Sequence, residues 1–257
     1  MNYQDKVVLV TGGANGIGRA IGWAYLKLGA AVVVADIDET KGKELQEQYL
    51  AMGYNAFFYE IDLCNVREID KLFRTILDKY QRIDILINNA GKGNFKSLYE
   101  LSIDEWDEII NLNLRAAFAA AQQFVLHTQG TSYGRIINIA STRYLMSEAN
   151  SEAYAASKGG LISLTHALAI SLSAENVTVN AISPGWIENN DYEQLTENDH
   201  QQHPSKRVGK PEDIAEMCLF LTDEKNDLCI RRVFCYNEED DSSIEWRLET
   251  WSVSKQY

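Results

Sequence analysis

Residues 7–18 read VVLVTGGANGIG, an apolar and β-branched run followed directly by a glycine-rich turn. The apolar run predicts a buried strand over Lys6–Val10, and the periodic apolar residues from Ile17 onward predict a helix. Glycines between a strand and a helix let the backbone approach a phosphate, whose charge also meets the amide groups at the helix start. The stretch is therefore typical of a nucleotide-binding βα unit, although a glycine-rich turn alone also occurs as a simple tight turn.

The same order of elements repeats along the chain. Strand-like runs alternate with amphipathic stretches, which indicates parallel βαβ units with helices on both faces of the sheet. Strands are predicted at Lys6–Val10, Ala31–Ala35, Asn55–Glu60, Ile83–Ile87, Arg135–Ala140 and Val177–Ile182. Helices are predicted from Ile17 and over Glu39–Ala51, Val66–Tyr80, Ile103–Leu126, Glu152–Ala174 and Pro211–Thr222. The fold class is thus α/β, a doubly wound parallel sheet in three α/β/α layers. The polar stretch Trp186–His203 is predicted as an irregular loop over one end of that sheet.

Composition excludes several classes of protein. The chain has 257 residues, 46% of them hydrophobic, which suits one large domain. A formal charge of −13 argues against nucleic acid as a partner, because the surface would repel the phosphate backbone. The cysteines form no C-x-x-C pair, so we expect neither disulfides nor a metal site. The segment MNYQDKVVLV has no basic leader, and no run of about 18 apolar residues occurs, so we expect a cytoplasmic protein without a membrane span.

Asp36 points to the type of nucleotide. It ends the second predicted strand, where a carboxylate accepts hydrogen bonds from ribose hydroxyls and repels a 2′-phosphate. Asp38 adds negative charge, while Asn15 and Ile37 bring no cation. NAD is therefore favoured over NADP, the other interpretation being that Asp36 is an ordinary turn residue after a strand.

Tyr154 and Lys158 form a candidate catalytic pair. They stand four residues apart on a predicted helix and so share one face. A neighbouring ammonium and a positively charged nicotinamide favour the phenolate of a tyrosine, whose pKa in water is about 10, and make it a usable acid or base. Ser141 closes the strand Arg135–Ala140 at the carboxyl edge, and Asn113 is an unfavoured residue inside a predicted helix that calls for a specific partner. Taken singly, each has an ordinary surface role as its alternative.

Together these residues resemble the short-chain dehydrogenase/reductase family, in the subgroup that includes glucose dehydrogenases and oxoacyl-carrier-protein reductases. The resemblance spans residues 1–227, predicted as the NAD-binding domain with the catalytic site. Its motifs are Thr11–Gly18, Asp62-Leu63, Asn88-Asn89-Ala90-Gly91, Asn113, Ser141, Tyr154-x-x-x-Lys158, Asn180 and Pro184-Gly185.

The resemblance implies a Ser-Tyr-Lys-Asn tetrad. Tyr154 would exchange a proton with the substrate oxygen, Ser141 would orient that oxygen, and Lys158 would bind the nicotinamide ribose and lower the pKa of the tyrosine. Asn113 would hold a water that links Lys158 to solvent. The implied cofactor-binding residues are Gly12, Asn15, Gly16, Ile17, Gly18, Asp36, Ile37, Asp62, Leu63, Asn89, Ala90, Gly91, Tyr154, Lys158, Pro184, Gly185 and Ile187.

On the substrate side, the expected residues are Ser141, Arg143, Tyr154 and Trp186. Arg143 is expected either to pair with an anionic group of the substrate or to be satisfied by Glu148 or Glu152. Asn189 stands where many relatives have a threonine that helps to hold the carboxamide and the pyrophosphate.

The C-terminus departs from the resemblance. Relatives carry a seventh strand and a G-x-x-x-x-V-D-G-G signature, whereas this chain has no glycine after Gly209. Residues 228–257 instead hold two of the four cysteines, two of the five tryptophans and the acidic run Glu238–Asp241. We predict an aberrant tail with a disrupted seventh strand, which arose by a frameshift near Leu228 or is a genuine extension with its own partner.

The resulting functional prediction is an NAD-dependent oxidoreductase that interconverts a secondary alcohol and a ketone. The resemblance also implies a homo-oligomer, a tetramer or a dimer. The alternative is a catalytically weak or inactive NAD-binding protein whose tail mediates an interaction. An epimerase on the same fold is less favoured, because the loop between Gly185 and Arg207 is short.

Overall fold

A parallel sheet forms the centre of the computed structural model, which describes residues 1–228 and 233–236. Its strand order is β3-β2-β1-β4-β5-β6-β7, and every neighbouring pair is parallel. The strands are β1 (Val7–Thr11), β2 (Ala31–Asp36), β3 (Ala56–Glu60), β4 (Ile85–Asn88), β5 (Gly134–Ile139), β6 (Val177–Pro184) and β7 (Val233–Tyr236). The chain crosses from β3 past β1 to β4, so the order reverses there, and the predicted doubly wound α/β class is confirmed.

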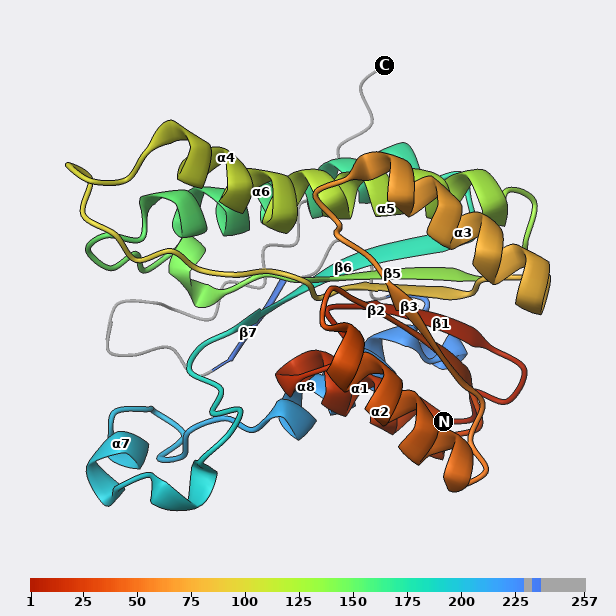
Figure 1. Ribbon diagram of the computed structural model, residues 1–257, viewed down its shortest axis with the longest axis horizontal. Helices are drawn as coiled ribbons and strands as arrows, with labels where there is room; N and C mark the ends of the chain where they lie inside the picture. The colour runs from red at the N-terminus through yellow and green to blue at the C-terminus, as the bar shows by residue number, and fades with distance from the viewer. Residues whose placement is uncertain (229–232, 237–257) are drawn as a thin grey trace.

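Helices cover both faces of the sheet, as Figure 1 shows. The helices are α1 (Gly16–Lys27), α2 (Glu39–Ala51), α3 (Val66–Tyr80), α4 (Ile103–Ile110), α5 (Ala116–Thr128), α6 (Glu152–Ser171), α7 (Glu197–Gln201) and α8 (Pro211–Thr222). One layer holds α3, α4, α5 and α6, and the other holds α1, α2 and α8, with α7 projecting beyond the carboxyl edge (Figure 1).

Alternation along β1 explains how the sheet joins the two layers. Val8 and Val10 belong to the core cluster that includes residues of α1 and α8, while Val7 and Leu9 belong to the cluster that includes residues of α3 and α5. Successive side chains of a strand point to opposite faces, so a fully apolar strand supplies both cores. Each buried aliphatic side chain of this size contributes about 1.5–3 kcal/mol relative to exposure.

The element boundaries agree closely with the sequence pattern, with two differences. The helix predicted over Ile103–Leu126 is interrupted by a π-helical turn at Asn111–Arg115, between α4 and α5. The segment predicted as an irregular loop contains α7, because Thr196 and Asp199 form a reciprocal capping box at its start.

The seventh strand corrects a prediction. The sequence predicts that this strand is disrupted, but β7 pairs with β6 from Ala181↔Val233 to Pro184↔Tyr236. Its valine and aromatic residues favour extended backbone, and Phe234 packs against the core cluster on the α1 and α8 side. The remainder of the predicted tail, residues 229–232 and 237–257, lies outside the described residues, so the frameshift and the extension both stay predictions.

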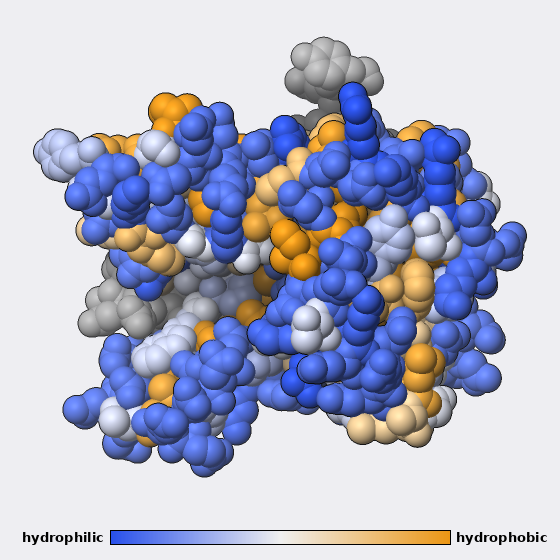
Figure 2. Space-filling model, in the orientation of Figure 1, coloured by the Kyte–Doolittle hydropathy of each residue, from blue (hydrophilic) through white to orange (hydrophobic). Residues whose placement is uncertain are grey.

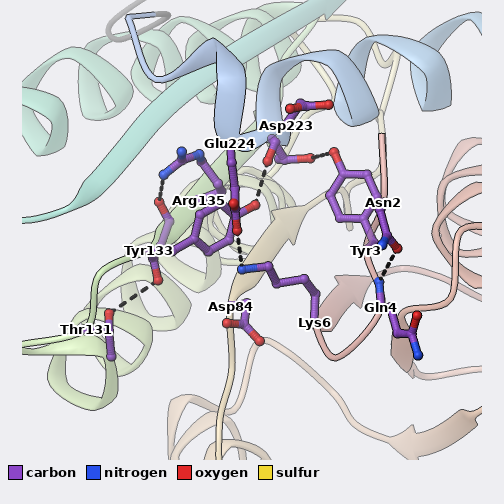
Figure 3. A network of polar contacts seen from close by, with 12 residues as sticks. Asn2, Tyr3, Gln4, Lys6, Asp84, Thr131, Tyr133, Arg135, Asp223 and Glu224 are labelled. Atoms are coloured by element: carbon purple, nitrogen blue, oxygen red, sulfur yellow. Dashed lines mark hydrogen bonds and ion pairs between the residues drawn. The ribbon is translucent and has the colours of Figure 1, made fainter.

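A polar network ties α8 to the amino ends of the strands (Figure 3). The Tyr133 hydroxyl donates to the Thr222 carbonyl at 2.5 Å, and the Lys6 ammonium lies 3.8 Å from the Tyr133 ring centroid. Lys6 also pairs with Glu224 at 2.7 Å. These contacts lie at the amino ends of the strands, opposite the carboxyl edge at which doubly wound sheets bind their ligands.

Candidate active site at the carboxyl edge

The glycine loop between β1 and α1 forms a cradle that only glycine permits. Gly12 and Gly16 have φ angles of +62° and +47°. A Cβ at Gly12 would lie 2.8 Å from the Ala90 Cα, and one at Gly18 would lie 2.2 Å from the Gly12 carbonyl oxygen. The N-cap residue of α1, Asn15, makes no side-chain capping bond. The first amide groups of the helix therefore have no side-chain cap, which suits a phosphate group at this end.

Asp36 lies at the end of β2 beside this loop. Its Oδ2 accepts from the Ala14 amide at 2.9 Å, and its Oδ1 accepts from the Asp38 amide at 3.0 Å. Asp38 in turn caps α2 by accepting from the Lys41 amide at 3.0 Å. The Asp36 carboxylate is thus fixed against the glycine loop, while Ile37 is 69% exposed beside it. Lys41 is a cation near the proposed ribose site that the sequence pattern did not indicate, and its ammonium pairs with Asp38 at 3.4 Å.

The segment that follows β4 contacts the end of β1 and the glycine loop through Asn89 and Ala90, with Gly91 next in the chain. The Asn89 side-chain amide donates to the carbonyls of Thr11 and Gly12 at 3.0 and 2.9 Å. The Thr11 hydroxyl accepts from the Asn89 and Ala90 amides at 3.0 and 3.1 Å. The segment after β4 is therefore held onto the glycine loop, and the two motifs predicted to share a site are brought together.

Leu63 reaches the same region from the end of β3. It lines one small pocket with Thr11, Ala90 and Leu112. The neighbouring Asp62 uses its Oδ1 to accept the Cys64 amide at 2.9 Å, which forms a tight turn. Both predicted residues of this motif thus stand at the carboxyl edge of the sheet.

Tyr154 and Lys158 lie on the same side of α6, as their spacing of four residues predicts. The Lys158 ammonium lies 5.6 Å from the Tyr154 ring centroid and donates to the Ile139 carbonyl at 2.7 Å. Burial lowers the pKa of Lys158 to about 8, because the interior disfavours its charged form. Burial raises the pKa of Tyr154, whereas a hydrogen bond from Ser141 and the charge of Arg143 act to lower it.

Asn113 lies in the π-helical turn, and this turn aims its side chain at the site. Its Nδ2 donates to the Lys92 carbonyl at 2.9 Å and to the Ser157 hydroxyl at 3.0 Å, while its Oδ1 accepts from the Lys92 amide at 3.0 Å. A Cβ at Gly91 would lie 3.1 Å from the Asn113 Oδ1 and 3.3 Å from the Lys158 Nζ. Single π-helical turns often occur at functional sites, and this one brings Asn113 close to Lys158.

Arg143 is engaged within the protein. Its Nε pairs with the Glu148 Oε1 at 3.1 Å, and its Nη1 donates to the Met146 carbonyl at 3.4 Å. The pairing with Glu148 is one of the two expectations for this residue, and contact of Arg143 with a substrate stays a prediction. The pair also lies close enough to Tyr154 for both charges to act on the pKa of that tyrosine: Arg143 lowers it and Glu148 raises it.

The segment after β6 forms the lower side of the site. Ile187 forms a parallel bridge with Gly209, and the Gly209 amide donates to the Trp186 carbonyl at 3.1 Å. The Trp186 ring is half-buried and lies 5.8 Å from the ring of His203. A Cβ at Gly16 would lie 2.9 Å from the Asn189 Oδ1, so Asn189 reaches the glycine loop. Figure 2 shows the molecule hollowed between this lower segment with α7 and the upper layer with α4.

Besides Lys41, the sequence did not single out three further residues at the site. Ser157 joins Asn113 to α6, and the ring of Phe95 lies 5.8 Å from the ring of Tyr154. His203 is fully buried, and neither of its ring nitrogens has a hydrogen-bond partner. Ser157 could have been predicted as a site residue because it adjoins Lys158 in the sequence. The positions of Phe95 and His203 in the sequence give no such indication.

Within residues 1–228 and 233–236, no group of three or more histidine, cysteine, aspartate or glutamate side chains could hold a metal ion. No helix in that part of the chain is long and apolar enough to cross a membrane.

Comparisons with known proteins agree with this fold. The family model described as short chain dehydrogenase matches residues 6–200. The chain is 40% identical over 230 residues to an uncharacterized oxidoreductase of Thermotoga maritima, covering 86% of this chain and 90% of that protein. It is 36% identical over 228 residues to a (hydroxy(phenyl)methyl)succinyl-CoA dehydrogenase subunit of Thauera aromatica, covering 87% and 92%. The crystal structure of gox2181 superposes with a TM-score of 0.85 at 25% identity, covering 91% and 95%.

Proposed function

The chain belongs to the short-chain dehydrogenase family, a family of oxidoreductases that bind a nicotinamide cofactor, and we propose that it uses NAD to interconvert a secondary alcohol and a ketone. The observation that carries this proposal is the convergence of Ser141, Tyr154 and Lys158 at the carboxyl edge, where the Lys158 Nζ adjoins Gly91. Doubly wound sheets bind their ligands at this edge. The site thus combines a phosphate cradle with a tyrosine that can exchange a proton.

The glycine loop and Asp36 support the choice of NAD. Gly12, Gly16 and Gly18 leave room for the pyrophosphate, with Asn15 and Ile17 beside it at the start of α1. The fixed Asp36 carboxylate suits the adenosine ribose hydroxyls and would repel a 2′-phosphate. When bound, the nicotinamide accepts or returns the hydride.

The other cofactor contacts follow from the positions of the remaining motifs. Asp62 and Leu63 would bracket the adenine, and Asn89, Ala90 and Gly91 would line the adenosine ribose. The backbone after Pro184 and Gly185, above all at Ile187, would meet the carboxamide.

Tyr154 carries the proton transfer in this mechanism. During oxidation its phenolate takes the proton of the substrate hydroxyl, and during reduction its hydroxyl gives the proton to the ketone oxygen. Ser141 lies close enough to Tyr154 to lower the pKa of that tyrosine, so it is placed to hold the same substrate oxygen. Lys158 supplies positive charge beside the ring, binds the nicotinamide ribose and so favours the phenolate. Asn113 completes the tetrad by holding the water that links Lys158 to solvent.

The substrate class rests on the same chemistry. A tyrosine paired with a hydride carrier serves a carbon that bears one hydroxyl and one hydrogen. The name of the Thauera relative describes such a secondary alcohol, which supports the class for this chain. Arg143 and Trp186 are proposed to contact the rest of the substrate, with Glu148 holding the guanidinium in place.

We also propose a homo-oligomer, a tetramer or a dimer, located in the cytoplasm. Large apolar side chains are exposed on the helices of the upper layer, where Ile103 is 74% exposed and Leu126 is 54% exposed. Subunit contacts are formed where such side chains gather into a contiguous apolar patch. Light scattering of the purified chain tests this, and a monomer at micromolar concentration would contradict it.

The experiment for the main proposal measures NADH formation against secondary alcohols, sugars and hydroxysteroids, with NADP in parallel. Tyr154→Phe should abolish turnover and keep NADH binding, while Tyr99→Phe, a control at a 99% exposed tyrosine, should change neither. NAD binding without turnover of any substrate would favour the alternative, a binding protein whose tail mediates an interaction. A preference for NADP would contradict the role given to Asp36.

A further inference from the structure

Phe95 places an exposed aromatic ring next to the proposed catalytic tyrosine. It lies in the loop that follows β4, and its ring centroid is 5.8 Å from that of Tyr154 at an interplanar angle of 47°. The side chain is nonetheless 55% exposed. A large apolar group that is open to solvent and touches the reacting residue has surface to bury against a ligand.

The ring is held in place by its own loop. A Cβ at Gly93 would lie 2.6 Å from the Phe95 Cε2, so the ring packs on the backbone where glycine leaves room. Contact with Gly93 and with Tyr154 restricts the ring from two sides. A side chain that is already ordered loses little conformational entropy when a ligand packs on it.

The position of Phe95 defines what it can contact. A substrate oxygen that hydrogen-bonds the Tyr154 hydroxyl holds the carbinol carbon just beyond that hydroxyl, and the Phe95 ring is a neighbour of the same tyrosine. Because the two ring centroids are 5.8 Å apart, a bulky substituent on that carbon can reach the Phe95 ring. On the next strand, the loop after β5 carries Leu145, which is 51% exposed, so that edge offers a second apolar side chain.

We propose that Phe95 determines substrate specificity by packing against an aryl or bulky alkyl group on the carbinol carbon. This inference rests on the proposed function of the site and deepens it, because it names the class of secondary alcohol. The ring contributes contact area and an aromatic face, while the proton transfer stays with Tyr154.

The test compares 1-phenylethanol with 2-propanol, two alcohols with the same reacting group that differ only in the substituent. Phe95→Ala should lower kcat/KM for 1-phenylethanol by about tenfold or more, mainly through KM, and should change that for 2-propanol by less than about threefold. Phe95→Leu should restore part of the loss, since it returns apolar area without the ring. Tyr99→Ala, which removes an exposed aromatic ring from the same loop, should leave both substrates unchanged.

The outcomes separate this inference from the proposed function. An equal loss for both alcohols in Phe95→Ala would show a merely structural role and overturn the inference, as would no loss at all. Turnover by the unaltered chain that is confined to alcohols without an aryl or bulky alkyl group would also overturn it and leave the oxidoreductase proposal standing. Absence of turnover with every alcohol would remove both.

Discussion

The side-chain amide of Asn113 donates to the hydroxyl of Ser157 at 3.0 Å, and this bond joins the π-helical turn to α6 one residue before Lys158. Ser157 in turn donates to the Tyr154 carbonyl at 2.7 Å. The tyrosine and the lysine of the proposed tetrad are thus tied to its asparagine through a serine that takes no part in the chemistry. The positions of these groups depend on one another.

Ser157→Ala tests this link. We expect it to destabilise the fold by about 1 kcal/mol, because one amide hydrogen of the buried Asn113 loses its partner. We expect kcat to fall by up to about tenfold, since small displacements of reacting groups are costly. Urea unfolding and steady-state kinetics measure the two effects. Ser171→Ala, an exposed serine at the end of the same helix, is the control, and equal effects of the two substitutions would disprove the link.

Gly18→Ala is expected to weaken NADH binding by at least about tenfold. The added Cβ would lie 2.2 Å from the Gly12 carbonyl oxygen, so the loop that cradles the phosphates must move. Gly22→Ala on the same helix is a matched control, because its Cβ would meet only Val32 at an ordinary 3.5 Å. NADH fluorescence titration compares the two, and unchanged binding in Gly18→Ala would refute the cradle.

Asp36→Ala should shift the preference from NAD towards NADP by about tenfold or more, which is about 1.4 kcal/mol. The substitution removes both the ribose acceptor and the charge that repels a 2′-phosphate. Asp38→Asn removes a neighbouring charge and keeps the side-chain oxygen that accepts from Lys41, so its effect should be smaller. The ratio of kcat/KM for the two cofactors is the measurement, and an unchanged ratio in Asp36→Ala would contradict the assignment.

Lys158 should make the stability of the cofactor-free protein depend on pH. Its pKa is lowered to about 8 by burial, whereas that of an unfolded lysine is about 10.4. Between these values the unfolded state binds more protons, so the free energy of unfolding rises with pH, and below about pH 8 the buried ammonium destabilises the fold. The free energy of unfolding of Lys158→Met should therefore exceed that of the original chain by most at pH 7, and by progressively less towards pH 9.5. Parallel pH curves from urea unfolding of the two proteins would argue against this.

Thr222→Val should destabilise the protein by about 1–3 kcal/mol. The Thr222 hydroxyl is fully buried and hydrogen-bonds the hydroxyls of Tyr3 and Tyr25 at 2.8 and 2.7 Å. Valine keeps the shape and removes one hydrogen-bond partner of each tyrosine, which leaves Tyr3 with the Leu219 carbonyl and Tyr25 with the Cys218 carbonyl. Thr75→Val, where the hydroxyl bonds the Lys71 carbonyl at the surface, serves for comparison. A similar denaturation midpoint for both variants would show that the network contributes little.

The sequence by itself determined the fold class and most element boundaries. The helices Glu39–Ala51, Val66–Tyr80 and Pro211–Thr222 begin and end where apolar periodicity and capping residues predict. Such signals are local, because a period of 3.6 or 2 and a cap depend on neighbours in the chain. The requirement for glycine at Gly18 is equally local, because a Cβ there would meet the Gly12 carbonyl oxygen of the same turn.

Only the tertiary structure decided how the side chains meet. The π-helical turn at Asn111–Arg115 accompanies bonds from Asn113 to Lys92 and Ser157, which are distant in sequence. The contact of Phe95 with Tyr154 likewise depends on where the loop after β4 meets α6. For Arg143 the sequence left Glu148 and Glu152 open as partners within the protein, and the geometry selected Glu148. No periodicity encodes such contacts, because they arise from packing between elements that the sequence places far apart.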